Sequence, residues 1–567
     1  MNYLDNYRYW CENAPQEYRA ELYALEGKDD TLKGCFGDEL AFGTAGIRGI
    51  MDLGCNRLNE FTVRRTAQGV AKWLCGTELP KVCAIGYDSR HNSRLYAEIC
   101  ATALAEAGIR VHIYHELAPT PMLSYAVREL HCGCGIMVTA SHNAGIYNGI
   151  KCYGEDGCQM TDEPAAIVYN EIKATPYFVP AQKTFEGLLA DGSIAYIEPA
   201  LWEAYYQRVL KEALRPEEIA KAGLHLVYTP LHGTGNKPVR EMFRRLGVKY
   251  DIVTCQELPD GDFTTCEYPN PETDAALNES YKIADVTHPD LILGTDPDCD
   301  RVAIAVPHNG EYRKLSGNEL GCVLMDYILR MRTENGDLPA GAECIKSIVS
   351  SPMADKIAES YGCKMMSVLT GFKYIGGEIL RLEGLGEEDK YVFGFEESCG
   401  YLKGTYARDK DAVVASMLVC EAAAWAKKNG MDLVDYLDSL YARFGCYAAK
   451  VQSVELQGIT ANEVSRAFMA SIRENTPAEI AGVKVTATAD YQSSVYKCLK
   501  CGRTEAIDLP KSNVFTMELG EQGKIIVRPS GTEPKIKLYY TAIGKDWNEA
   551  NALLASLQDG MKGFLPA

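Results

Sequence analysis

Two turns of the chain carry residue types suited to phosphoryl transfer. A serine lies on the first, Thr139-Ala140-Ser141-His142-Asn143, which follows the apolar residues 135–138. A hydroxyl can carry a phosphoryl group only when neighbouring groups handle the proton and the phosphate charge, and His142 and Lys151 are of the right chemical type. For an arbitrary serine, a helix cap or a turn hydroxyl is the simpler interpretation. Because of its neighbours, Ser141 is a candidate nucleophile.

The second turn carries three carboxylates at alternate positions. It reads Gly294-Thr295-Asp296-Pro297-Asp298-Cys299-Asp300-Arg301 and separates two apolar segments, residues 291–293 and 302–306. The carboxylates repel one another unless a cation lies between them, and oxygen ligands suit a hard ion such as Mg²⁺. A solvated acidic loop is the alternative, and an EF-hand fits poorly because its Gly and Glu positions are not met. Arg301 can hold a phosphoryl oxygen beside the ion.

Two further loops also follow apolar strands. In Gly394-Phe395-Glu396-Glu397-Ser398-Cys399-Gly400, Glu396 and Ser398 can exchange hydrogen bonds with sugar hydroxyls, although Glu-rich turns usually lie on the surface. The other loop reads Arg528-Pro529-Ser530-Gly531-Thr532-Glu533-Pro534-Lys535. Its basic side chains, its hydroxyls and a Gly that frees backbone N–H groups predict a cradle for an anion. An ordinary polar hairpin is the alternative.

The elements that must position these loops repeat along the chain. Three times an apolar strand (residues 82–87, 224–228 and 345–349) leads through a polar loop into an amphipathic helix ending at Gly108, Gly247 or Gly362, and another apolar strand follows. This alternation is typical of parallel α/β sheets, and Gly suits the left-handed position that closes a helix. From about Cys446 the rhythm is lost, and shorter strands are predicted over residues 449–456, 483–489, 524–527 and 536–541. We expect an α/β protein with three similar α/β domains in series, residues 1–210, 211–318 and 319–445, plus a C-terminal α+β domain, residues 446–567.

The charge and hydropathy of the chain limit its partners. A formal net charge of −19 repels nucleic acid and anionic membrane surfaces, so a phosphorylated ligand must be held by a local basic site. No run of about 18 apolar residues spans a bilayer, and the first residues lack the apolar core of a signal peptide. We expect a soluble cytoplasmic protein.

The 21 cysteines are scattered through predicted strands and helices, which is typical of reduced, buried thiols. Cys498 and Cys501 have the spacing of metal ligands or of a redox pair, and Cys132 and Cys134 form a second close pair. Neither has a partner pair at zinc-finger spacing. Ordinary thiols near a turn are the favoured interpretation.

With these four loops in this order, the sequence resembles the α-D-phosphohexomutase superfamily, in particular its longer phosphoglucomutases, whose relatives include phosphopentomutase and glucose-1,6-bisphosphate synthase. The resemblance covers nearly the whole chain. It begins at Phe42-Gly43-Thr44-Ala45-Gly46-Ile47-Arg48-Gly49, which matches the N-terminal signature of the family, and ends at the loop around Arg528. It implies four domains around a central cleft, each supplying one loop.

The resemblance also implies roles for individual residues. Ser141 would be the phosphoserine and would bind Mg²⁺ together with Asp296, Asp298 and Asp300. Arg48 and Lys151 would stabilise the transferring phosphoryl group, and Lys410, in Arg408-Asp409-Lys410-Asp411, would manage a proton. Sugar and phosphate binding would fall to Arg301, Thr370, Gly371, Lys373, Glu396, Ser398, Arg528, Ser530, Gly531 and Thr532.

The implied reaction interconverts glucose 1-phosphate and glucose 6-phosphate, with glucose 1,6-bisphosphate as intermediate and activator. Phosphomannomutase or phosphopentomutase activity, a silent phosphosugar sensor and a phosphatase are the alternatives. One departure from the family is Ala144, where a Pro commonly follows Ser-His-Asn, so the loop around Ser141 loses a rigid φ angle. A monomer or a small homo-oligomer is expected.

Overall fold

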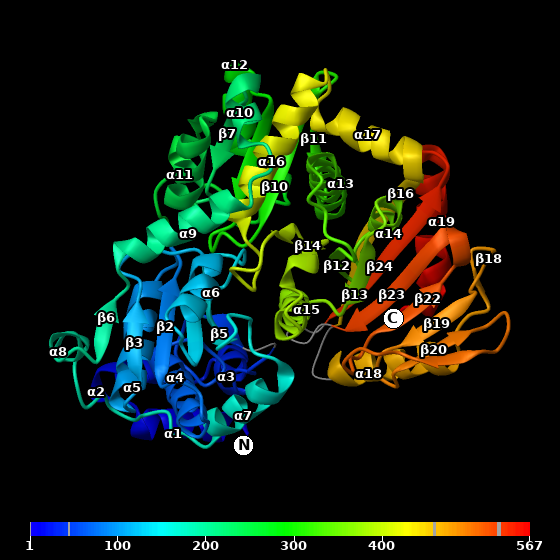
Figure 1. The fold of residues 1–567 in the computed structure, drawn as a ribbon. Helices are drawn as coiled ribbons and strands as arrows, with labels where there is room; N and C mark the ends of the chain where they lie inside the picture. Colours follow the sequence, from blue (N-terminus) through cyan, green and yellow to red (C-terminus); the bar gives the residue numbers. More distant parts are fainter. Residues whose placement is uncertain (1, 44–45, 457–460, 530–534, 567) are drawn as a thin grey trace.

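The computed structural model describes residues 2–43, 46–456, 461–529 and 535–566. Four main sheets follow one another in an arc, from the blue N-terminal region to the orange and red C-terminal region in Figure 1. Each sheet lies within one predicted domain, which confirms the α/β architecture of three similar domains followed by a C-terminal domain. The limits of the domains and a cleft between them stay predictions. Among the described helices, none has both the length and the apolar character needed to cross a bilayer.

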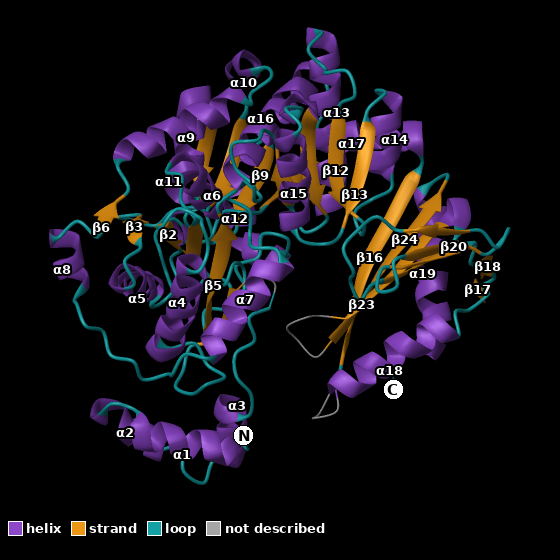
Figure 2. Ribbon diagram, turned by 60° about the horizontal axis from the view of Figure 1, so that its bottom comes forward, coloured by secondary structure: helices purple, strands orange, loops and turns teal. Residues whose placement is uncertain are grey.

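The first domain contains a six-stranded sheet in the order β1-β5-β4-β2-β3-β6. Its strands are β1 (Gly46–Ile50), β2 (Val82–Tyr87), β3 (Arg110–Ile113), β4 (Cys134–Val138), β5 (Tyr147–Gly154) and β6 (Ile194–Tyr196). Its helices are α1 (Tyr3–Asn13), α2 (Gln16–Tyr23), α3 (Asp29–Phe36), α4 (Glu60–Cys75), α5 (Ser93–Glu106), α6 (Thr120–Glu129), α7 (Asp162–Lys173), α8 (Phe185–Ala190) and α9 (Pro199–Lys211). Helices α1 to α3 form a cluster of their own beside the sheet, around buried Trp10 and Phe36 (Figure 2).

The second domain contains a five-stranded sheet in the order β11-β10-β9-β7-β8. Its strands are β7 (His225–Thr229), β8 (Lys249–Ile252), β9 (Leu291–Thr295), β10 (Val302–His308) and β11 (Glu311–Leu315). Its helices are α10 (Pro216–Ala222), α11 (Asn236–Leu246), the short 3₁₀ helix η1 (Thr254–Gln256) and α12 (Asp274–Thr287).

The third domain contains a four-stranded sheet in the order β13-β12-β14-β15. Its strands are β12 (Glu343–Ser347), β13 (Lys364–Val368), β14 (Tyr391–Glu396) and β15 (Gly400–Leu402). Its helices are α13 (Gly317–Asn335), α14 (Met353–Ser360), α15 (Phe372–Gly384), η2 (Glu388–Lys390), α16 (Ala412–Lys428) and α17 (Leu433–Phe444). Helix α16 also packs on α10 and α11, so it ties the third domain to the second.

The C-terminal domain contains a seven-stranded antiparallel sheet in the order β16-β24-β23-β22-β19-β20-β21. Its strands are β16 (Cys446–Glu455), β19 (Ala487–Asp490), β20 (Val495–Cys498), β21 (Thr504–Ala506), β22 (Phe515–Glu518), β23 (Gly523–Pro529) and β24 (Lys535–Gly544), with β17 (Glu479–Ile480) and β18 (Val483–Lys484) forming a separate pair. Its helices are α18 (Ala461–Glu474), η3 (Gly520–Gln522), α19 (Trp547–Met561) and η4 (Lys562–Phe564). Both α18 and α19 pack on the long strand β24.

The first three domains place their candidate loops at the same point of the fold. In each, three or four parallel strands form the core of the sheet, and the outer parallel strand at one side turns back into an antiparallel neighbour. The Ser141 turn joins β4 to β5, the aspartate turn joins β9 to β10, and the Glu396 turn joins β14 to β15. The three loops are therefore structurally equivalent elements of a repeated unit.

Most predicted strands are confirmed, with small shifts. The strand at residues 82–87 coincides with β2, and those at 224–228 and 345–349 correspond to β7 and β12. Gly247 closes α11 in the left-handed conformation at φ 70°. The single strand predicted at residues 483–489 is wrong, because β18 pairs with β17 while β19 joins the main sheet.

Candidate active site

Ser141 lies at the centre of the site on a strained turn. The residue is buried and has a φ of 53°, a left-handed conformation that costs a non-glycine residue roughly 1–2 kcal/mol. Its hydroxyl Oγ lies 3.1 Å from Oδ2 of Asp296 and 3.1 Å from Nδ1 of His142. Such strain persists only where surrounding contacts impose it, and it is commonly found at functional sites.

Arg90 supplies those contacts. Its guanidinium donates to four backbone carbonyls of the turn, at 2.6 Å to Ser141, 2.5 Å to Asn143, and 2.9 Å each to Ala144 and Tyr147. The arginine is itself held by Asp88, whose Oδ2 lies 3.3 Å from Nε of Arg90 and accepts a hydrogen bond of 2.6 Å from Thr139. These bonds fix the turn that contains Ala144, the position where the related proteins commonly have Pro.

The three aspartates of the second domain face Ser141. Asp296, Asp298 and Asp300 are buried, and one carboxylate oxygen from each lies within 4.8 Å of the others. The backbone N–H groups of Asp300 and Arg301 each donate to Oδ1 of Asp296 at 3.0 Å. Within the described chain, Oδ1 of Asp298 and Oδ1 of Asp300 accept no hydrogen bond although both are buried. Unsatisfied buried carboxylate oxygens are costly, and a hard divalent cation fits this donor set.

Cationic side chains of the first and third domains lie against Asp298 and Asp300. Nζ of Lys151 lies 2.6 Å from Asp298 and 3.1 Å from Asp300, and Nζ of Lys410 lies 3.1 Å from Asp300. Burial opposes ionisation of Asp300, but the charges of Lys151, Lys410 and Arg301 hold its pKa well below the ordinary value. Burial, followed by repulsion from the other two aspartates, raises the pKa of Asp296. A cation in the triplet would counteract that repulsion.

His142 and Arg48 extend the first-domain side of the site. Burial, followed by the charges of Arg301 and Arg48, lowers the pKa of His142 well below the usual value, so the imidazole is neutral at physiological pH. Arg48, on β1, donates from Nη1 to Oδ1 of Asn143 at 3.1 Å. Arg301 pairs with Glu272 at 3.2 Å, which orients its guanidinium beside the aspartate turn.

The third domain contributes a further carboxylate, that of Glu396. The backbone N–H of Gly371, at φ 124°, donates to Oε1 of Glu396 at 2.6 Å. Thr370 and Ser398 lie in the loops on either side of this bond. Lys373 forms an ion pair of 2.5 Å with Asp162 of α7, so it links the third domain to the first.

The fourth-domain loop is described only at its ends. Burial raises the pKa of Tyr374 and of Tyr539 to about 12, and the charge of Arg528 counteracts part of each shift, which places Arg528 near both rings. Arg528 therefore lies in the neighbourhood of Glu396, whose charge also acts on the Tyr539 ring. Ser530, Gly531 and Thr532 lie outside the described residues.

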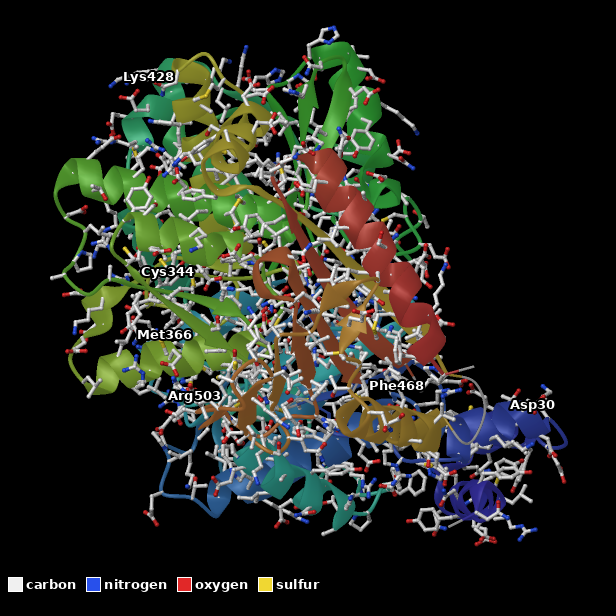
Figure 3. The ribbon with its side chains drawn as sticks, turned by 90° about the vertical axis from the view of Figure 1, so that its right-hand side faces the viewer. Asp30, Cys344, Met366, Lys428, Phe468 and Arg503 are labelled. Carbon is white, nitrogen blue, oxygen red and sulfur yellow. The ribbon has the colours of Figure 1, made fainter. Side chains whose placement is uncertain are left out.

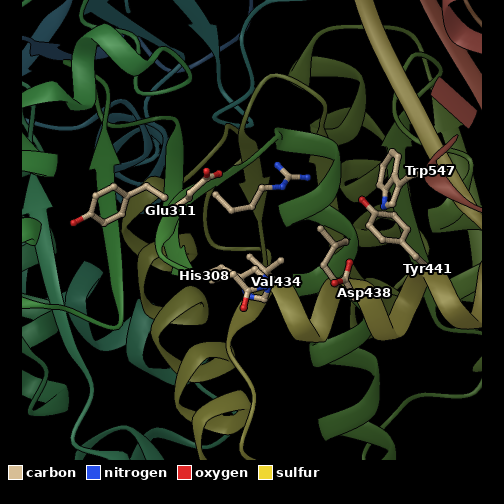
Figure 4. A pocket seen from close by; sticks show the side chains of 10 residues that line it. His308, Glu311, Val434, Asp438, Tyr441 and Trp547 are labelled. Atoms are coloured by element: carbon tan, nitrogen blue, oxygen red, sulfur yellow. The ribbon is translucent and has the colours of Figure 1, made fainter. Parts of the chain in front are cut away.

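A second group of possible ligands lies elsewhere, where β10, α17 and α19 meet. Nδ1 of His308 lies 2.7 Å from Oδ2 of Asp432, beside a hollow of about 410 Å³ that Tyr441 and Trp547 also line (Figure 4). Asp432 and Asp435 form the capping box of α17, so their oxygens already accept backbone N–H groups. The Asp296 triplet is the better metal centre because its free oxygens lack such partners.

Three residues of the site escaped prediction from the sequence. Arg90 lies in the polar loop Asp88-Ser89-Arg90 after the strand at residues 82–87, and that position is its only signal in the sequence. Thr120, at the start of α6, donates from Oγ1 to Oδ2 of Asp298 at 3.0 Å, and nothing in its neighbours indicates this. Glu397, next to Glu396, accepts a hydrogen bond of 3.0 Å from Ser347, and burial raises its pKa to about 7.

Known protein families match each of the four domains of the chain. Four family models described as phosphoglucomutase/phosphomannomutase match in order: alpha/beta/alpha domain I over residues 39–177, domain II over 203–310, domain III over 316–444, and the C-terminal domain over 503–552. A phosphoglucomutase of Staphylococcus aureus is 35% identical over 537 residues, which cover 94% of each chain.

Solved structures share the fold. A phosphoglucomutase/phosphomannomutase family protein of Burkholderia thailandensis superposes with a TM-score of 0.67 at 16% identity, covering 93% of this chain and 98% of that one. The Paramecium protein parafusin, a phosphoglucomutase solved in its open form, gives a TM-score of 0.66 at 18% identity, covering 93% and 95%. An N-acetylphosphoglucosamine mutase of Aspergillus fumigatus, solved with GlcNAc-6P and magnesium, gives 0.53 at 13% identity, covering 99% of both chains. By its four domain models and its near full-length relatives, the chain belongs to the phosphoglucomutase/phosphomannomutase family of the α-D-phosphohexomutase superfamily.

Proposed function

We propose that the protein is a phosphoglucomutase that interconverts α-D-glucose 1-phosphate and glucose 6-phosphate through phosphorylated Ser141. The observation that carries the proposal is the 3.1 Å separation between Oγ of Ser141 and Oδ2 of Asp296 across two domains. Relatives named phosphoglucomutase at 35% identity over nearly the full chain support the choice of reaction. Glucose 1,6-bisphosphate is then the intermediate and the activator.

Mg²⁺ is the proposed cofactor. Asp296, Asp298 and Asp300 would hold it together with the phosphoryl group on Ser141, and the two buried oxygens without hydrogen bonds support this donor set. When bound, the ion supplies a Lewis acid that offsets the charge of the transferring phosphoryl group. The Aspergillus relative was solved with magnesium, which agrees with the donor set.

The chain's own side chains then position and neutralise the reactants. Lys151 lies against two of the aspartates, where its ammonium can shift to the phosphoryl oxygens. Arg301 approaches from the aspartate turn and Arg48 from β1. Phosphoryl transfer needs mainly such positioning and charge stabilisation. Neutral His142, with Nδ1 3.1 Å from Oγ, can accept a hydrogen bond from the Ser141 hydroxyl when Ser141 takes a phosphoryl group back.

Proton transfer at the sugar is assigned to Lys410. Burial lowers the pKa of this ammonium, but Asp300 and Asp409 outweigh that effect and raise it above the ordinary value. Lys410 is therefore an ammonium, which can donate a proton to the sugar oxygen that leaves when the bisphosphate returns a phosphoryl group to Ser141. Asp409, which lies 3.0 Å from Nζ and accepts a hydrogen bond from Tyr153 at 2.8 Å, holds it in place.

We assign binding of the sugar ring to the third domain and binding of the phosphate that does not react to the fourth domain. Glu396 and Ser398 would bind vicinal hydroxyls, with Thr370, Gly371 and Lys373 orienting the ring, and Arg528, Ser530, Gly531 and Thr532 would hold the phosphate that does not react. The bisphosphate must turn over between the two transfers, so each end of the sugar visits each phosphate site.

A comparison of hexose and pentose substrates tests the reaction. Under our proposal kcat/KM for glucose 1-phosphate exceeds that for mannose 1-phosphate and ribose 1-phosphate, and phosphate release stays negligible. Preference for mannose or ribose 1-phosphate favours the phosphomannomutase or phosphopentomutase alternative, and steady release of inorganic phosphate indicates a phosphatase. Cytoplasmic location and a monomeric or small homo-oligomeric state stay predictions.

A further inference from the structure

The hairpin between β20 and β21 carries two cysteines that the mutase reaction does not use. Its sequence Cys498-Leu499-Lys500-Cys501-Gly502 begins at the last residue of β20, and β21 is the edge strand of the C-terminal sheet. Arg503, directly before β21 (Thr504–Ala506), lies on the outer part of the molecule in Figure 3. Cys498 is half-buried and Cys501 is exposed.

Backbone hydrogen bonds hold this turn in one geometry. The N–H of Gly502 donates to the carbonyl of Cys498 at 2.9 Å, and the N–H of Cys498 donates to the carbonyl of Arg503 at 2.9 Å. Gly502 has a φ of 73°, which lets the chain reverse directly after Cys501. The Gly502 bond encloses both cysteines in one turn of five residues, and the Cys501 side chain is a hydrogen-bonding neighbour of the Cys498 thiol, so the two thiols are neighbours in space.

The pair differs from most of the other cysteines in exposure, and Cys498 differs also in its pKa. Seventeen of the 21 thiols are buried, and the remaining two exposed ones, Cys75 and Cys255, lie on separate elements. The Cys501 thiol, followed by the backbone N–H groups of Cys501 and Lys500, lowers the pKa of Cys498. Burial raises the pKa of Cys255. Cys498 therefore has a higher thiolate fraction than Cys255, and the thiolate is the nucleophile.

The surroundings do not favour zinc. Structural zinc needs about four ligands, and neither of the two groups of three or more His, Cys, Asp and Glu ligands found among the described residues contains a cysteine. A pair of neighbouring thiols without further ligands suits thiol–disulfide exchange instead.

We propose that Cys498 and Cys501 are a reversible thiol–disulfide site whose oxidant is a low-molecular-weight disulfide. The Cys498 thiolate attacks one sulfur of the small disulfide, the S–S bond breaks, and one small thiol leaves and takes up a proton. The Cys501 thiolate then attacks the Cys498 sulfur of the mixed disulfide and releases the second small thiol. The protein loses two protons and two electrons, and the small disulfide gains them as two thiols.

The test uses the reduced full-length protein and oxidised glutathione as the probe. After incubation, free thiols are alkylated and the intact mass is measured. We expect loss of two alkylatable thiols without a retained glutathione, a linked peptide containing Cys498 and Cys501, and full reversal by dithiothreitol. The Cys501→Ser variant should instead retain one glutathione on Cys498, because the second thiol is missing. The Cys498→Ser variant should react with oxidised glutathione more slowly, because it lacks the attacking thiolate.

Two variants and one metal measurement complete the design. Cys75→Ser and Cys255→Ser should form the same internal disulfide as the unsubstituted protein. Three results overturn the proposal: a stable glutathione adduct on Cys498 in the unsubstituted protein, free Cys498 and Cys501 under conditions that modify Cys75 or Cys255, or one equivalent of zinc retained after gel filtration and lost only in the Cys498→Ser and Cys501→Ser variants.

Discussion

The hydroxyl oxygen of Ser141 lies 3.1 Å from Oδ2 of Asp296, although 155 positions separate the two residues in the chain and their strands belong to different sheets. The contact places a nucleophile from the first domain against an acidic triplet from the second. Lys151 completes the junction by pairing with two of the same aspartates from the first-domain side. Any change that separates the two turns should therefore affect metal dependence and phosphoryl transfer together.

Replacing Asp298 tests the metal centre. Asp298→Asn removes a charge from the triplet and weakens the pairing with Lys151, so we expect kcat to fall by about 100-fold or more, with a higher Mg²⁺ requirement. The measurement is a coupled glucose 6-phosphate assay over a range of Mg²⁺. Asp274→Asn, an exposed carboxylate of the same domain, is the control and should behave as the unsubstituted enzyme. An unchanged Mg²⁺ dependence in Asp298→Asn would count against the triplet as the metal site.

Arg90 should act as a positioning residue for Ser141. Arg90→Lys keeps the charge beside Asp88, but an ammonium cannot reproduce the planar set of bonds to four carbonyls. We expect kcat to fall by roughly 100-fold because small displacements of reacting groups have effects of this size, while KM changes little. Arg94→Lys, exposed and paired with Glu98, should leave kcat unchanged.

The same Arg90→Lys protein should load phosphate from glucose 1,6-bisphosphate more slowly. Its thermal midpoint shows whether it is folded. A folded variant with normal kcat and loading rate would exclude the positioning role.

Gly371 should control the carboxylate of Glu396. At φ 124° an alanine is strained by about 1–3 kcal/mol, although its Cβ meets no close neighbour. Relief of that strain moves the N–H that holds Glu396, so we expect Gly371→Ala to raise KM for glucose 1-phosphate several-fold. Gly377→Ala, in the middle of α15 with open space around the new Cβ, should be neutral or slightly stabilising. Equal KM values in both variants would show that the Gly371 bond is unimportant for sugar binding.

Glu421 should make stability depend on pH. Burial raises its pKa to about 7, although its carboxylate accepts the N–H groups of Leu214 and Arg215. Because the folded value exceeds the unfolded one of about 4.5, folding binds a proton between these values, and stability falls as pH rises from about 5 to 8. The loss is roughly 3 kcal/mol at most.

Glu421→Gln removes that penalty while retaining an acceptor oxygen. The difference in thermal midpoint between variant and unsubstituted protein should therefore grow in favour of the variant from pH 5 to pH 8. Parallel curves across this range would show that Glu421 does not ionise with a raised pKa.

The local pattern of apolar and polar residues was sufficient to predict the parallel strands of the first three domains and the loops that follow them. The aspartate turn was predictable because its acids interrupt two apolar strands, and these are β9 and β10. The two separate strands within residues 483–489 were not predictable. The chain changes sheets near Val485, and which sheet each part joins depends on strands distant in the sequence. Arg90 and Thr120 escaped for the same reason, since each acts on a turn that only folding brings near.

The most direct test of the account is the intact mass of the protein before and after incubation with glucose 1,6-bisphosphate and Mg²⁺. The unsubstituted enzyme should gain one phosphoryl group, and a peptide map should place it on Ser141. The Ser141→Ala protein should gain none and should have no mutase turnover. A phosphoryl group on another residue, or full turnover by Ser141→Ala, would contradict the proposed phosphoserine mechanism.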